Sequence, residues 1–153
     1  MLPVLGLVAA LLSTSSCCGG YAVVRTTVHD HAEVSPSGEV AAGSGTVLHY
    51  SRLGEPLNSC GSGTKYLEDL WIQVPSVQPG AAYALGAPGV VAAYLRGQDG
   101  NPVRATAVSG KIRIKEQTRD GLSAELQVTI RLPSGEEVKL DDEYAFHSRP
   151  EPQ

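Results

Sequence analysis

Two histidines spaced two residues apart, His29 and His31, form the pattern in this chain that comes nearest to a metal site. On an extended strand both imidazoles would point to the same face, from which they can reach one ion. The other histidines, His49 and His147, are distant in the sequence, and no HExxH or CxxC motif accompanies any of the four. A solvated polar segment is the more ordinary explanation of the pair. We therefore expect no bound metal, and a metal-dependent hydrolase that uses His29 and His31 is the less favoured alternative.

The remaining candidate residues lack the spacing that a calcium site, a phosphate-binding loop or a catalytic nucleophile requires. The acidic run at 136–143 has no Asp-x-Asp-x-Asp-Gly order of a calcium loop, and its alternation predicts a solvated strand face. Residues 61–65 differ from a phosphate loop, in which Gly-Lys-Ser/Thr opens a helix. Trp71, the single tryptophan, is of the type that covers a sheet or joins a core. With no Gly-x-Ser-x-Gly nucleophile elbow either, we predict no catalytic residue, no cofactor and no enzymatic activity.

Composition and charge indicate one domain that does not bind nucleic acid. The 153 residues are enough for a single hydrophobic core. Twelve Lys and Arg residues against 16 Asp and Glu give a net charge of -4, and the chain has one Trp and one Phe. Nucleic-acid binding requires clustered cations that neutralise phosphates. We therefore exclude nucleic acid from the expected partners.

An apolar segment opens the chain. Residues 2–12 are Leu, Val and Ala with one Pro and one Gly, and a run of Ser and Thr follows at 13–16. A membrane-spanning helix needs about 20 apolar residues, so this segment is too short to span a bilayer. Its length matches the apolar region of an export signal that is cleaved after small residues. The sequence therefore predicts a signal peptide over 1–16 and a protein that works outside the cytoplasm.

The residues that precede Cys17 resemble the lipobox of bacterial lipoproteins, in which the cysteine after the cleavage site carries diacylglycerol and becomes the N-terminus. In this resemblance Cys17 is the lipidated residue, and Ser15 and Ser16 are the small residues before the cut. Thr14 stands where the family usually has Leu, Val or Ile, and Cys18 is the alternative acceptor. The resemblance implies a lipid anchor in the bacterial cell envelope, outside the cytoplasm. Secretion without a lipid is the alternative.

Acylation of Cys17 would explain why the chain has an odd number of cysteines. Of the three, Cys18 and Cys60 then remain as an even pair. A disulfide between them would close a loop of about 42 residues and stabilise the fold by roughly 3–4 kcal/mol in the chain-entropy model. We predict a tether over 17–21, and the alternative to the disulfide is that Cys18 is only a small residue of this flexible tether and that Cys60 is a free thiol.

The clearest structural pattern is a strict alternation over 123–132. Five apolar residues at even positions alternate with polar residues, which predicts a strand with one buried face. A turn at 133–136 leads into a second run, so we predict that the two runs form an antiparallel hairpin. Asp142 falls on an inward position of the second run, where we expect a β-bulge or a strand break.

Similar short runs of β-forming residues, divided by Gly, Pro, Asn and Asp turns, extend along the rest of the chain. No amphipathic helical pattern follows Gly20. We predict an all-β domain over 22–153, a single antiparallel β-sandwich of about eight short strands, with a small β-barrel as the alternative. The other expected strands cover 22–28, 46–52, 66–74, 81–85, 90–96 and 108–117.

These features together predict a non-catalytic binding or structural module that is anchored in the cell envelope through acylated Cys17. Its expected partners are the membrane, through the lipid, and a protein or ligand that the sequence does not specify. A secreted, soluble ligand-binding β-domain is the alternative function.

Overall fold

Each described residue of the chain lies in a strand or in a connection between strands. The computed structural model describes residues 23–54, 66–98 and 101–148, so the predicted signal peptide, the tether and Cys60 lie outside it. No helix that is long and apolar enough to cross a membrane occurs in these three ranges. The strands are β1 (Val23–Val34), β2 (Val40–Gly54), β3 (Tyr66–Val74), β4 (Ala82–Ala84), β5 (Val91–Gln98), β6 (Asn101–Arg104), β7 (Ala107–Thr118), β8 (Gly121–Arg131) and β9 (Glu137–Ser148).

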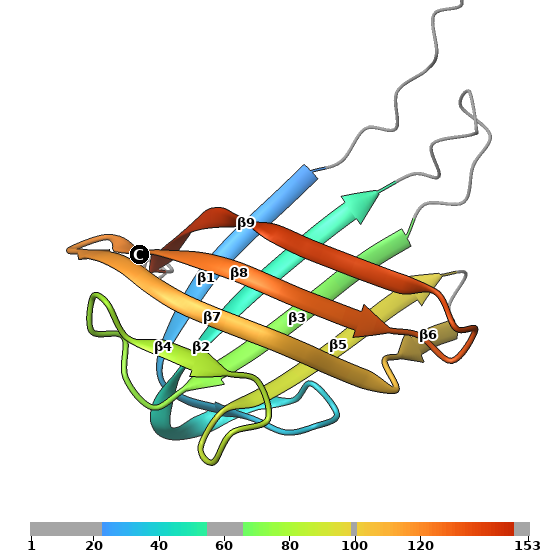
Figure 1. Cartoon of the computed structure of the whole chain (residues 1–153), viewed down its shortest axis with the longest axis horizontal. Helices are drawn as coiled ribbons and strands as arrows, with labels where there is room; N and C mark the ends of the chain where they lie inside the picture. The colour runs from blue at the N-terminus through green and yellow to red at the C-terminus, as the bar shows by residue number, and fades with distance from the viewer. Residues whose placement is uncertain (1–22, 55–65, 99–100, 149–153) are drawn as a thin grey trace, which may run out of the picture.

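The strands form one open sheet that is folded into two facing layers. Their order is β4-β7-β8-β9-β1-β2-β3-β5-β6, and Figure 1 shows β7, β8 and β9 crossing in front of β1, β2, β3 and β5. Neighbouring strands are antiparallel except β1 and β9, which pair in parallel at Thr27↔His147 and Val28↔Ser148. The all-β prediction is confirmed. The described sheet differs from it in detail: it has nine strands, four of them at least 12 residues long, and one parallel pair.

Apolar side chains of the two layers fill the space between them. Leu126 and Ile130 on β8 are fully buried, whereas Gln127 and Thr129 point to the other face and are only partly buried. Burying a side chain of the size of Leu or Ile stabilises a fold by roughly 1.5–3 kcal/mol, so this core holds the layers together. Its other buried members are Val28, Leu48, Tyr50, Leu70, Ile72, Val74, Tyr94, Ile112, Ile114, Leu122, Ala124, Val128, Leu132, Leu140 and Phe146.

The predicted hairpin between β8 and β9 is confirmed, but the predicted interruption of β9 is wrong. Gly135 has a left-handed φ of 89°, and its N–H donates to the Leu132 carbonyl at 2.9 Å, which closes the turn. β9 then continues without a register shift through Asp142, which lies opposite Leu126. β1 pairs with β9 only at the C-terminal end of β9, at His147 and Ser148. The edge of β9 beside Asp142 therefore has no neighbouring strand. The Asp142 carboxylate is therefore exposed to water, although the alternation of β9 places it on the inward-facing side of the strand.

The β1–β2 hairpin bends at His31 and turns back onto the sheet. His31 has a left-handed φ of 51°, and the β1–β2 register shifts between Asp30 and Ala32. Beyond the bend, the Val34 N–H donates to Oε1 of Gln73 on β3 at 2.8 Å. The hairpin tip thereby covers part of the outer face of the layer. A second, smaller apolar cluster forms there from Ala32, Val34, Val47 and Ala93, with Trp71 and Val91 packed against it.

Candidate functional site

The strand that carries His29 and His31 is not regular between them. His31 lies in the bend of β1 and is exposed, whereas His29 is partly buried before the bend. His29 instead lies beside His49 of β2, with the ring centroids 6.2 Å apart. Within residues 23–54, 66–98 and 101–148, no group of three or more His, Cys, Asp or Glu side chains could hold a metal ion. The fold therefore brings His29 close to His49 and not to His31, which the spacing in the sequence had suggested as its partner.

A groove crosses the outer face of β1, β2 and β3, on the side of this layer that faces away from the other one. The strand register places Thr27, His49 and Trp71 in one row and Arg25 and Ser51 in the next. The groove has a volume of about 500 Å³, which is in the range of small-molecule sites. We call it the outer groove, and its lining residues are Arg25, Thr27, His29, Val40, His49, Ser51 and Trp71.

Two contacts fix the imidazole of His49 in the outer groove. Its Nε2 lies 2.7 Å from Oδ1 of Asp69, the neighbouring outward residue on β3. Its ring also stacks on the indole of Trp71, with centroids 5.0 Å apart and the planes inclined by 9°. A carboxylate partner sets the orientation of an imidazole, and stacking removes its remaining freedom. His49 is therefore a rigid part of the groove wall.

The β1–β2 hairpin fixes Trp71 in turn. Gly38, in the turn at the hairpin tip, has a left-handed φ of 87° and lies so close that a Cβ there would be 2.9 Å from Cζ3 of Trp71. Only glycine permits this approach and this backbone conformation together. The indole is partly buried and packs against the second apolar cluster. Trp71 is thus a residue that covers the sheet, and its indole forms part of the floor of the outer groove.

The outer groove is lined by polar side chains that can bind a ligand. Arg25 supplies donors, the imidazoles and the hydroxyl groups of Thr27 and Ser51 can donate or accept, and no carboxylate lines the groove. In the described part of the chain, Asp69 is the one side chain that hydrogen bonds to His49. The arrangement suits a polar or anionic ligand.

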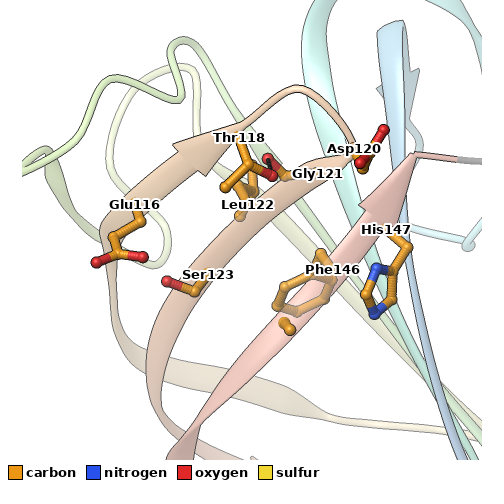
Figure 2. Close-up of a pocket in the computed structure, with 9 residues that line it drawn as sticks. Glu116, Thr118, Asp120, Gly121, Leu122, Ser123, Phe146 and His147 are labelled. Carbon is orange, nitrogen blue, oxygen red and sulfur yellow. Dashed lines mark hydrogen bonds between the residues drawn. The ribbon is translucent and has the colours of Figure 1, made fainter.

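A second pocket of about 380 Å³ lies beside the turn between β7 and β8 (Figure 2). Glu116, Asp120 and His147 are among its lining residues. Figure 2 shows Glu116 and His147 on opposite sides of the pocket, with their polar ends pointing apart. The Asp120 carbonyl accepts the Ser148 N–H at 2.9 Å, which ties this turn to the end of β9. Glu116 and His147 therefore do not meet in this pocket.

A buried carboxylate, Glu68, lies on the inner face of β3 and is only 2% exposed. Its register partners are Arg52 on β2 and Arg96 on β5. Glu68 accepts hydrogen bonds from Arg52 Nε at 2.8 Å, from Arg96 Nη2 at 2.7 Å and from the Tyr94 hydroxyl at 2.6 Å. Arg96 also donates to Glu136 in the opposite layer at 3.0 Å. This Glu68 cluster joins three strands and both layers at the end of the sandwich where β1 begins.

Burial changes the acidity of two tyrosines near the Glu68 cluster. Burial, together with the hydrogen bond to Glu68, raises the pKa of Tyr94 above its usual value. Burial also raises the pKa of Tyr50 to about 12, with a contribution from the neighbouring Tyr144. The rings of Tyr50 and Tyr144 meet edge to face, with centroids 5.1 Å apart. An ordinary phenol is already protonated at neutral pH, and the raised pKa values extend this protonated, hydrogen-bond-donating state into alkaline solution.

The acidic run on β9 faces solvent, as its alternation predicts. Glu137, Asp141 and Glu143 are exposed. Because β8 lies between β7 and β9, the cations of β7 do not face these carboxylates. Glu137 pairs instead with Arg131 at 2.8 Å, and this hydrogen bond and charge hold the pKa of the Glu137 carboxyl below its usual range. Lys115 of β7 lies 4.0 Å from Glu125 of β8.

The lipidation candidate Cys17 and the disulfide candidates Cys18 and Cys60 lie outside the described residues. Sequence reasoning did not single out the His49–Asp69 pair or Glu68. A signal for Glu68 was present, because it shares a strand face with the apolar residues of β3. Comparison of the chain with protein-family models, with curated proteins and with solved structures finds no match.

Proposed function

We propose that this chain is a non-catalytic binding module, anchored by a lipid in the bacterial cell envelope. Cys17 carries the lipid, and the outer groove receives the ligand or partner. The observation that carries the proposal is the outer groove itself, a hollow of about 500 Å³ in which polar side chains surround the indole of Trp71. A secreted domain that lacks the lipid but uses the same groove is the alternative.

The rigidity of the groove supports a binding role. His49 is held by Asp69 and Trp71, and Trp71 is held by the hairpin turn at Gly38. Side chains that are fixed before a ligand arrives lose little conformational entropy on binding, which favours affinity. The groove is also built on strands, which hold their side chains more precisely than loops do.

The spacing along the chain supports anchoring. β1 begins at Val23, six positions after Cys17. Six residues span at most about 20 Å, so a lipid on Cys17 would hold the sandwich close to the membrane surface. Each buried CH₂ group contributes about 0.8 kcal/mol, and stable anchoring takes more than one acyl chain. Diacylglycerol supplies two chains.

Two matched cysteine variants test the anchor. Cys17→Ser should accumulate as an uncleaved or released precursor, because the acceptor thiol is lost. Cys18→Ser should still be processed and should stay in the membrane fraction. The reverse pattern would assign the lipid to Cys18, and a wild-type protein found only in the soluble fraction would support the secreted alternative.

The fluorescence of Trp71 tests the groove, because this tryptophan is the only one in the chain. Fractions of the envelope of the native cells are added to the purified protein, and the fraction that contains the ligand should shift the emission of Trp71. Ser51→Phe, which fills the groove, should abolish the shift. Ser109→Phe, an exposed position in the other layer, should leave it unchanged. Equal responses from both variants would contradict a ligand site in the outer groove.

A further inference from the structure

Exposed large apolar side chains gather at one end of the described sandwich. Four such residues occur in the described ranges: Val24 at 43%, Leu53 at 43%, Leu67 at 45% and Val40 at 41% exposure. Leu53 and Leu67 are direct partners on neighbouring strands and share the outer face, whereas Val24, which pairs with Arg52, points to the inner face. These three are at the end where β1 begins, and Val40 is at the opposite end, near the tip of the β1–β2 hairpin. Solvent-exposed apolar groups that cluster in this way mark an interaction surface.

A cation lies next to the leucine pair. Arg25, Ser51, Leu53 and Leu67 together line a pocket of about 270 Å³ on the outer face, which adjoins the outer groove through Arg25 and Ser51. No carboxylate lines this pocket. An arginine beside exposed leucines matches a phospholipid surface, where an anionic headgroup meets the first apolar carbons.

The place of this end along the chain decides which occupant it meets. In Figure 1, β1 begins, β2 ends and β3 begins at the same end of the sandwich. Arg25 lies eight positions after Cys17, so it can be at most about 28 Å from that residue along the chain. A lipid on Cys17 would therefore present this end of the domain to the bilayer more often than any other.

We propose that the end surface formed by Arg25, Leu53 and Leu67 docks onto the bilayer that holds the anchor, with Arg25 bound to an anionic lipid headgroup. This inference rests on the proposed lipid anchor. The leucine pair enters the headgroup region of the bilayer. The docked domain has a fixed orientation instead of swinging freely on its tether.

Photo-crosslinking in vesicles tests the orientation. The photoreactive residue benzoylphenylalanine replaces Leu67, Leu53 or, as the matched control, Val40, which is equally exposed at the opposite end. Each full-length, processed protein is reconstituted in vesicles of phosphatidylcholine, with or without phosphatidylglycerol. Mass spectrometry then counts lipid adducts after illumination. We expect adducts at positions 53 and 67 in several-fold excess over position 40, and a higher yield when phosphatidylglycerol is present.

A charge variant tests the headgroup contact. Arg25→Gln should lower the adduct yield at position 67 about fivefold in the anionic vesicles, since one cation near an anionic surface changes its affinity by roughly that factor. Arg113→Gln, an exposed arginine of β7 in the other layer, should leave the yield unchanged. Equal lipid adducts at positions 67 and 40 would overturn the proposal, and so would adducts to a protein in place of a lipid. The intact mass of the same samples reports acylation of Cys17 separately, so a missing anchor and a missing docking surface give different results.

Discussion

The Glu68 cluster allows a sharp test of how the sandwich is held together. Glu68→Gln keeps the shape of the side chain but removes its charge. Arg52 and Arg96 then lose the charge of the carboxylate that they share, although Arg96 keeps Glu136, and the Tyr94 hydroxyl loses a charged acceptor. The matched control is Glu136→Gln, the same chemical change in another carboxylate that is bound to Arg96.

The burial of the two carboxylates determines the expected magnitudes. Removing one partner of a buried ion pair costs about 3–5 kcal/mol, because an uncompensated charge stays in the interior. The side chain of Glu68 is 3% exposed, but those of Arg52 and Arg96 are 30% and 14% exposed, so water relieves part of that cost. We expect Glu68→Gln to lower the free energy of unfolding by about 2–4 kcal/mol. Glu136, with a side chain 55% exposed, is in the class of surface pairs that contribute below about 1 kcal/mol.

Urea unfolding of the purified protein, followed by the fluorescence of Trp71, measures both changes. The two variants should differ in the midpoint of the transition and share its slope, since neither alters the surface exposed on unfolding. Nearly equal losses, or a loss below about 1 kcal/mol for Glu68→Gln, would refute the reasoning that Glu68 is a buried tie between the strands.

Three further predictions concern the core, the tyrosines and the groove. Val128→Asp should cost several kcal/mol in chemical unfolding and Thr129→Asp well under that, because only the first places a carboxylate in the core; equal losses would contradict the half-buried strand. The pKa of Tyr50 is raised to about 12 in the fold and is about 10 in an unfolded chain, so its stabilisation is present below pH 10 and is lost as the pH rises toward 12. A pH series of unfolding curves should therefore show a smaller alkaline loss for Tyr50→Phe than for the wild type, and identical losses would argue against the buried phenol. His49→Ala should unstack Trp71, shift its emission to longer wavelength and cost about 1 kcal/mol, whereas an unchanged spectrum would contradict the stacked pair.

Local patterns predicted the parts of the fold that depend on neighbours in the sequence. The alternation at 123–132 and the turn at 133–136 correspond to β8 and its hairpin, and 66–74 corresponds to β3. β1 and β2 extend beyond their predicted ends, to Val34 and back to Val40, because the hairpin tip continues the pairing past the bend at His31. β6 was not expected, since its four residues include Pro102 and directly follow a turn sequence. β6 forms because it pairs with β5, although its own sequence does not favour a strand.

The features that depend on strand order were not visible in the sequence. Glu68 is flanked by Arg52 and Arg96 only because β3 lies between β2 and β5. His49 on β2 contacts Asp69 on the neighbouring strand β3, and no rule of sequence spacing connects two residues that are so far apart in the chain. At Asp142 the alternation predicted an inward position. The edge of β9 is uncovered there, so the carboxylate is exposed to water.

The proposal of a lipid-anchored binding module is tested most directly by intact-mass spectrometry of the protein recovered from the membrane fraction of its native cells. We expect a chain that begins at Cys17 and carries the mass of diacylglycerol on that residue. A chain that retains residues 1–16, or one that begins elsewhere and carries no lipid, would contradict it.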